Sequence, residues 1–381
     1  MRFLRRISTR RLVTLCATIV AVAVAGAAIA LAATAGGPTP PPKPLARAIH
    51  DALAAPPVQG VSARIRFTNH LIDKSSLGEG ADPLLTGATG RLWASREGTL
   101  RIELQSDGGA GDSQILVDKT RFTIYDAGAN TVYRGTLPQH RGSHEQHAHR
   151  VPTVRAIQRE LTRLMGDVTL SGARPGDIAG RPAYTVRITP KRDAGLLGAA
   201  ELAWDATTGV PLRAAVFAKG DTSPVLELKA TDISYGRVAA STFAIQPPSG
   251  AKVVDLTARD IGHAPLQTKL PFRLDAPATL AGMRRSSVRL IASDEHPAAL
   301  VAYGRGPGGI AVIESQAQPQ PDRGPALGGL QLPSVSIGGV TGAQELDTAL
   351  GTAITFTRGG IDYVVLGSVA PSVARAAARG L

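Results

Sequence analysis

The chain has 381 residues, and about 150 residues per domain predicts two or three domains. Hydrophobic residues make up 43% and aromatic residues only 4%, which predicts an aliphatic core of ordinary size. The single cysteine excludes a disulfide framework and any multi-cysteine metal site, whereas the net charge of +12 raises the question of a nucleic-acid partner.

The first 35 residues have the pattern of an export segment. Five arginines within residues 2–11 precede an uncharged run of 22 residues at 12–33, long enough to cross a hydrocarbon core of about 30 Å. By the positive-inside rule, residues 1–35 are predicted to be a cytoplasmic basic stub and a single transmembrane helix that anchors the chain in the cytoplasmic membrane. A signal peptide cleaved after Ala35 is the alternative and would give a secreted protein. Both place the bulk of the chain outside the cytoplasm, which argues against a nucleic-acid partner.

After a proline-rich linker at 36–44, the period of the sequence changes from helical to strand-like. A helix is expected at 45–54, with an apolar face formed by Leu45, Ala48, Ile49 and Leu53. Short alternating or apolar runs follow, most of them separated by Gly, Asp or Asn, at 61–67, 89–95, 100–104, 114–118, 121–125, 131–134, 183–189, 199–204, 212–217 and 225–229. These runs predict one large antiparallel sheet.

One amphipathic helix interrupts the strands, at 153–165, with apolar residues on one stripe and arginines opposite. A sheet with such a helix in mid-chain suggests a curved sheet with helices packed across one face. A linker is expected at 254–275, followed by a smaller α+β domain at 276–381. Within that domain, strands at 352–357 and 361–366 flank a glycine turn, and a final helix starts at Pro371 and ends at Gly380.

Candidate chemistry is sparse along the chain. Four histidines in ten residues are weak candidates for a zinc or copper site, although a solvated loop is the simpler interpretation; they are His140, His144, His147 and His149. The glycine-rich segment 304–309 precedes a β-like run rather than a helix, so it is predicted to be a hairpin turn and not a nucleotide site. Ser113 follows Gly-Asp as in some esterases, but no base or oxyanion donor lies nearby. We therefore expect no enzyme activity and no cofactor.

A resemblance to a known superfamily lies between about 180 and 253. The segment 201–213 (ELAWDATTGVPLR), the strand 185–190 before it, the segment 226–235 and the ending 243–253 (FAIQPPSGAKV) resemble the LolA/RseB/LppX superfamily. From 45 to 180 the resemblance is one of pattern only, so a LolA-like domain is expected at 45–253. The arrangement of this domain followed by a smaller one is most similar to RseB. The C-terminal segment from 345 resembles an uncharacterised domain found beside LolA-like units in exported proteins of the actinobacterial type.

The resemblance implies an unclosed half-barrel, covered by helices, whose concave face holds acyl chains or lipid. LolA-like members carry lipoproteins, LppX-like members bind envelope lipids, and RseB-like members regulate an anti-sigma factor. We therefore expect non-catalytic binding of lipid or lipoprotein acyl chains, with an envelope-stress regulator that binds an anti-sigma factor as the alternative and an exported hydrolase as the least favoured role. The expected ligand-binding residues are Ile65, Phe67, Leu100, Ile102, Leu104, Ile115, Val117, Val154, Ile157, Leu161, Leu164, Val186 and Ile188. Ordinary core packing is the alternative for each of them.

Overall fold

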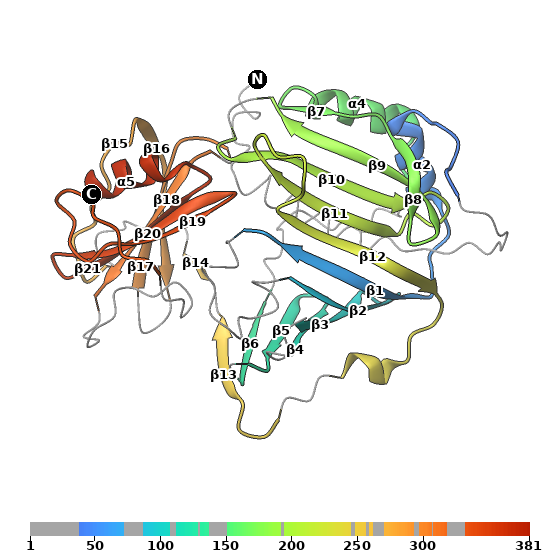
Figure 1. The fold of residues 1–381 in the computed structure, drawn as a ribbon, viewed down its shortest axis with the longest axis horizontal. Helices are drawn as coiled ribbons and strands as arrows, with labels where there is room; N and C mark the ends of the chain where they lie inside the picture. The colour runs from blue at the N-terminus through green and yellow to red at the C-terminus, as the bar shows by residue number, and fades with distance from the viewer. Residues whose placement is uncertain are drawn as a thin grey trace. The chain divides into compact units, whose positions relative to one another are not determined.

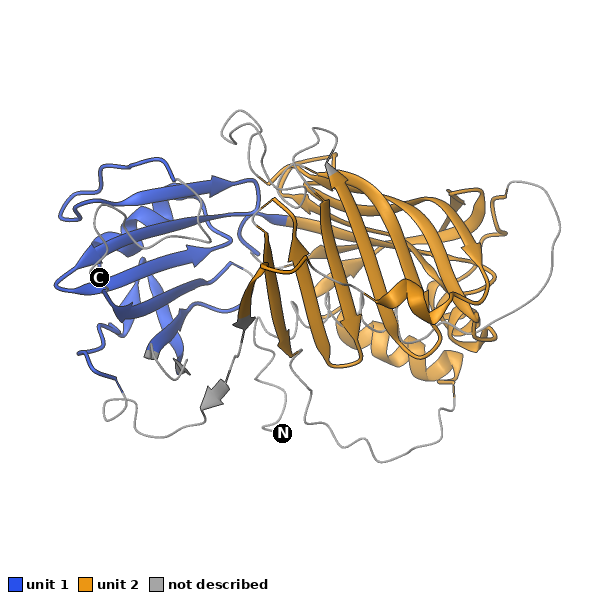
Figure 2. Ribbon diagram, turned by 90° about the horizontal axis from the view of Figure 1, so that it is seen from below, with its two compact units in different colours: residues 1–13, 193–197, 257–381 blue, residues 14–192, 198–256 orange. Residues whose placement is uncertain are grey.

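The computed structural model describes residues 38–71, 87–106, 112–128, 130–136, 151–191, 194–244, 248–256, 259–261, 270–292, 297–306, 308–317 and 332–381. These residues divide into two compact units, shown in Figure 2 in orange and blue. The N-terminal unit contains the described residues up to 256, apart from 194–197. The C-terminal unit contains those four residues and the described part of 257–381.

In the described residues, the N-terminal unit is one sheet of 13 strands with two α-helices (Figure 1). Its helices are α2 (Leu45–Ala54), α4 (Val154–Leu164) and the 3₁₀ turn η2 (Ala240–Phe243). Its strands are β1 (Gly60–Asn69), β2 (Ala88–Ser95), β3 (Thr99–Ser106), β4 (Asp112–Asp118), β5 (Arg121–Asp126), β6 (Thr131–Thr136), β7 (Val168–Leu170), β8 (Arg174–Ile178), β9 (Arg181–Pro190), β10 (Leu197–Asp205), β11 (Pro211–Ala218), β12 (Leu226–Tyr235) and β13 (Lys252–Leu256).

The strands run in the order β13-β6-β5-β4-β3-β2-β1-β12-β11-β10-β9-β7, with β8 paired to β9. The sheet curls, and the first strand, β1, pairs with β12 near its middle (Figure 1). β13 pairs with β6 in parallel, which departs from the all-antiparallel expectation. This happens because the segment after β12 crosses the sheet at β3, where Arg101 donates to the carbonyl oxygen of Thr242 at 2.5 Å, and then reaches the far edge.

The helices pack on the sheet near β7–β10. Ala48 of α2 contacts a cluster that contains Tyr184, Val186 and Trp204, while Ala46 packs against Ile157 and Leu161 of α4. Thr153 caps α4 by accepting from the backbone N–H of Ala156 at 3.3 Å, as its position before the helix favours. Leu45, Ala48 and Ile49 of the expected apolar face do pack in these clusters. The expected position of Leu53 is wrong, since its side chain is 43% exposed and the buried residues of α2 are Ala46 and Ala48.

The described part of the C-terminal unit is an eight-stranded sheet with one helix, α5 (Pro371–Arg379), which packs against β20 and β21. The strand order is β14-β16-β17-β18-β21-β20-β19, with β15 paired to β16. The strands are β14 (Arg259–Ile261), β15 (Thr279–Leu280), β16 (Met283–Ala292), β17 (Pro297–Tyr303), β18 (Ile310–Gln316), β19 (Gln344–Thr348), β20 (Gly351–Arg358) and β21 (Ile361–Gly367). The core is aliphatic around the stacked rings of Phe356 and Tyr363.

The structure tests the expected linkers and turns. Strands β13 and β14 lie at 252–256 and 259–261, within or beside the stretch expected to be a linker. In the proline-rich linker, the carbonyl oxygen of Pro41 accepts from Tyr184 Oη at 2.6 Å, so this part of the linker lies against the sheet. The glycine-rich segment at 304–309 joins the paired strands β17 and β18, which confirms the hairpin. The β20–β21 hairpin turns at Gly359 and Gly360, whose φ angles of 58° and 77° favour glycine.

Two expectations lie outside the described residues. They are the transmembrane helix at 12–33 and the histidine group at 140–149. Among the helices that the structure describes, none combines the length and apolarity needed to cross a bilayer.

Candidate functional site

Two rows of apolar side chains run across β2–β6 on one face of the sheet. Directly paired residues of antiparallel strands share a face, so the pairings place each row on the same side. One row is Leu92, Ile102, Ile115, Ile124 and Tyr133; the other is Ala94, Leu100, Val117 and Phe122. We call these nine residues the apolar face. All nine are half-buried rather than buried.

The apolar face begins at a packed cluster and continues beyond it. Its first members, Leu92, Ala94 and Ile102, contact a cluster that contains Ile65, Leu104 and Leu212, while the members on β4–β6 belong to no buried cluster of the described residues. The side chains on β4–β6 are therefore half-buried on this face without belonging to a buried cluster of the described residues.

The thirteen expected ligand-binding residues fall into three places. Leu100, Ile102, Ile115 and Val117 lie on the apolar face. Ile65 and Leu104 are each 3% exposed in the cluster at its closed end, with Phe67 beside them. The other six lie near the helices, where Ile157 and Leu161 are buried against α2 and Leu170; they are Val154, Ile157, Leu161, Leu164, Val186 and Ile188.

The last group has the contacts of a packed helix pair. Val186 contacts the Ala48 cluster, and Ile188 pairs with Leu170 of β7, which also packs against α4. The apolar stripe of α4 therefore faces α2 and β7, and the clusters of the described residues do not join it to the strands β3 and β4.

The sequence analysis did not identify the members of the apolar face on β5 and β6. Phe122 and Ile124 on β5 and Tyr133 on β6 continue both rows. The alternation in the run 121–125 was a sufficient signal for the first two, since they stand two residues apart in a strand. For Tyr133 the pairing of β6 with β5 was needed, and the sequence does not supply that register.

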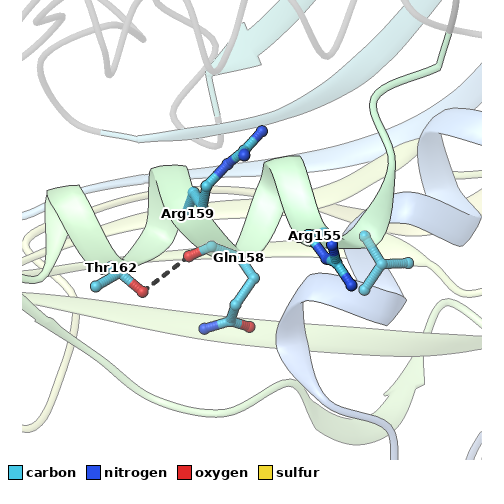
Figure 3. A pocket seen from close by; sticks show the side chains of 5 residues that line it. Arg155, Gln158, Arg159 and Thr162 are labelled. Carbon is cyan, nitrogen blue, oxygen red and sulfur yellow. Dashed lines mark hydrogen bonds between the residues drawn. The ribbon is translucent and has the colours of Figure 1, made fainter.

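A separate hollow of about 580 Å³ lies on the solvent side of α4 (Figure 3). Its described lining comes from this helix alone: Val154, Arg155, Gln158, Arg159 and Thr162. Thr162 Oγ1 donates to the carbonyl oxygen of Gln158 at 2.9 Å, and the side chains of Gln158 and Arg159 point away from each other (Figure 3). Gln158 and Arg159 therefore do not converge on one point in the hollow.

The opposite side of the sheet, which we call the outer face, carries an ion cluster. Glu201 of β10 accepts from Arg213 at 2.6 Å, from Arg174 at 2.8 Å and from Arg187 at 3.1 Å. Burial raises the pKa of the Glu201 carboxyl, but the hydrogen bonds from Arg213, Arg187 and Arg174 outweigh it and hold the pKa below its usual value. Arg187 also stacks on Phe217, with its guanidinium carbon 4.3 Å from the ring centroid. These ion pairs stabilise the sheet, and the carboxylates of Glu201 and Glu227 are both bound to arginine.

The described residues hold no group of three or more His, Cys, Asp or Glu side chains that could bind a metal ion. The segment that resembles an esterase motif begins β4, where Ser113 is fully buried.

No protein-family model and no curated protein matches the chain. Among solved structures, the MucA/MucB complex from Pseudomonas aeruginosa is similar over 88% of this chain and 94% of that chain, at 18% identity and a TM-score of 0.42. A crystal structure of MucB in complex with MucA(peri) has the same coverages and TM-score, at 16% identity. The LolA superfamily protein NE2245 from Nitrosomonas europaea matches 53% of this chain and 98% of that chain, at 12% identity and a TM-score of 0.22. Because these TM-scores are below 0.5, we base the proposals that follow on the chain's own residues.

Proposed function

We propose that this chain is a LolA/RseB-like, non-catalytic protein that binds acyl chains of a lipid or lipoprotein on the apolar face of its curled sheet. The observation that supports it is the half-buried state of both apolar rows across β3–β6. A sheet that leaves part of these side chains in contact with water forgoes the free energy of burying that part, about 25 cal/mol per Å² of apolar surface. An acyl chain laid across the strands recovers it.

The residue types also suit such a ligand. The face is aliphatic apart from Phe122 and Tyr133, and aliphatic surface binds methylenes without directional contacts. Each buried methylene contributes about 0.8 kcal/mol, so a chain of about sixteen methylenes gives on the order of 13 kcal/mol before the cost of ordering it. Part of this gain is sufficient for stable binding.

The N-terminal export segment supports the location of this activity. The arginines and the apolar run of the first 35 residues favour a single-pass anchor with both described units outside the cytoplasm, or secretion if the segment is cleaved. A membrane-tethered binding protein is thus the form that we propose.

Native mass spectrometry of the full chain after mild extraction tests the proposal. We expect lipid adducts on the wild type and their loss in Ile124→Gln, because an amide placed among methylenes weakens the contact by roughly 10-fold to 100-fold. The matched control is Thr123→Gln, which changes the neighbouring position on the outer face. Thermal melts show whether both variants are folded.

Bare polypeptide from the wild type, or equal loss of adducts in both variants, would contradict acyl-chain binding. A protein partner that co-purifies with the full chain and is lost on deletion of 276–381 would favour instead the alternative role, a regulator that binds an anti-sigma factor.

A further inference from the structure

Four basic side chains form a strip on the outer face, on the neighbouring strands β2, β1 and β12. Arg64 of β1 is directly opposite Arg91 of β2, and Arg66 of β1 is directly opposite Lys229 of β12. Side chains paired in this way lie about 5 Å apart on the same face, where like charges destabilise the pairing. We call Arg64, Arg66, Arg91 and Lys229 the cationic strip.

Nearby acids do not neutralise the cationic strip. Glu103 is opposite Arg91 from β3, but its carboxylate binds Arg101 instead. Asp232 is opposite Arg64 from β12, at the bulge between Arg64 and Ile65. Within the described part of the chain, no ion pair or hydrogen bond joins a side chain of the strip to a partner. Asp232 therefore offsets part of the charge of Arg64, while the side chains of Arg66, Arg91 and Lys229 have no carboxylate partner among the described residues.

The rest of the outer face is arranged differently. On β8–β11, the cations Arg174, Arg187 and Arg213 all bind Glu201, and Arg213 also binds Glu227 at 2.5 Å. Arg213 is directly opposite Lys229, so the change from paired to unpaired cations occurs between two adjacent strands. On the outer face, the cations of β8–β11 are thus paired with carboxylates, whereas those of the cationic strip face one another. The strip is therefore the part of this face that is suited to an external anion.

The shape of the strip indicates which anion. Arg64, Arg66 and Arg91 are exposed and Lys229 is half-buried, and together they span three strands, which at about 4.8 Å per strand gives a broad charged area. A lipid bilayer offers many phosphates over such an area, whereas an extended acidic peptide offers one line of charges. We propose that the cationic strip docks the N-terminal unit on a membrane surface that contains anionic phospholipids.

Trp93 provides a natural reporter of this contact. It lies on the outer face of β2, opposite Arg101, and the only other tryptophan, Trp204, is 6% exposed. The full chain is mixed with phosphatidylcholine vesicles that carry a spin label on their headgroups, with and without phosphatidylglycerol, and the quenching of tryptophan fluorescence is measured. Trp93→Phe identifies the share of the signal that comes from Trp93.

We expect Trp93 to be quenched only on vesicles with phosphatidylglycerol, and less as salt increases. The double variant Arg64→Gln/Arg66→Gln removes one member of each like-charge pair. At about 1 kcal/mol per basic residue near an anionic surface, its docking constant should fall about 30-fold. The matched control Arg155→Gln/Arg159→Gln makes the same charge change on the exposed side of α4 and should bind within about twofold of the wild type.

Melting of the strip variant at or above the wild-type temperature would support the reasoning, because the substitution removes repulsion. Quenching that does not depend on phosphatidylglycerol, or equal losses in the two double variants, would overturn it. Tighter binding to a polyglutamate peptide than to vesicles of equal anionic charge would also overturn it, in favour of an acidic protein partner.

Discussion

Asp205 holds together the turn between β10 and β11, within the segment that resembles the LolA/RseB/LppX superfamily. Its side chain is 1% exposed and accepts from the backbone N–H groups of Thr207 at 2.8 Å and Thr208 at 3.0 Å. It also accepts from the hydroxyl of Tyr235 at 2.6 Å, which ties the turn to the end of β12. Burial raises the pKa of Tyr235, and the negative charge of Asp205 and its hydrogen bond raise it further. The hydroxyl therefore remains protonated, and a donor, at any physiological pH.

Asp205→Ala should therefore be among the most destabilising substitutions in this unit. Hydrogen bonds to a charged group contribute about 1.5–3 kcal/mol each. Because the variant also relieves the cost of burying the carboxylate charge, we expect the free energy of unfolding to fall by about 3–5 kcal/mol rather than by the full sum. Asp205→Asn keeps an acceptor for the two backbone donors and should cost about 1 kcal/mol. In the Asp205→Ala background, Tyr235→Phe should cost much less than in the wild type, because the hydroxyl has already lost the Asp205 carboxylate.

Urea denaturation followed by tryptophan fluorescence measures these values. Both tryptophans, Trp93 and Trp204, lie in the N-terminal unit, so the signal reports on this unit alone. A loss below about 1 kcal/mol for Asp205→Ala, or an equal loss for Asp205→Asn, would refute the assignment of the carboxylate as the centre of the turn.

Other residues give further predictions. Burial raises the pKa of Glu314 to about 7, against a hydrogen bond from the backbone N–H of Asp275, so the folded chain holds this proton more tightly than the unfolded chain. The free energy of unfolding should fall by roughly 3 kcal/mol between about pH 4.5 and pH 7, and melts of Glu314→Gln should lack this dependence. Gly90→Ala should lower the free energy of unfolding by more than about 2 kcal/mol, because a Cβ there would lie 1.9 Å from the carbonyl oxygen of Glu103. The control Gly172→Ala has open space around the added Cβ and should be nearly neutral in the same urea denaturation assay.

Much of the fold could be predicted because local patterns determine it. The limits of α4 follow from its cap and its apolar stripe. Nine of the ten expected strand runs between 61 and 229 lie within strands, and the tenth, 225–229, begins one residue before β12. The short strands β7 and β8 were missed: β8 contains Pro175 and Gly176, which disfavour a strand locally, and it forms only because β9 supplies a partner. The parallel contact of β13 with β6 was missed for the same kind of reason, since a pairing between distant segments leaves no local signal.

The candidate site was predictable only in part. Alternation identified Ile102 and Ile115 as inward-facing residues, yet it identified Ile65 and Leu104 by the same rule, and these are buried in the core. Alternation reports which face a side chain is on, and not whether that face is covered. The same limit applies to the cationic strip, where each arginine has the pattern of an ordinary solvated face until the register places Arg64 opposite Arg91.

The two proposed surfaces are coupled through the geometry of β1. Because side chains alternate along a strand, Arg64 and Arg66 lie on the outer face while Ile65 and Phe67 lie on the opposite side, with the apolar rows. A unit docked through the cationic strip therefore turns its apolar face away from the bilayer. It follows that docking does not itself deliver an acyl chain to the apolar face, and that loading requires either the undocked state or a partner that brings the chain. Loss of the strip should then weaken membrane contact and leave the lipid adducts unchanged, while loss of Ile124 should do the reverse.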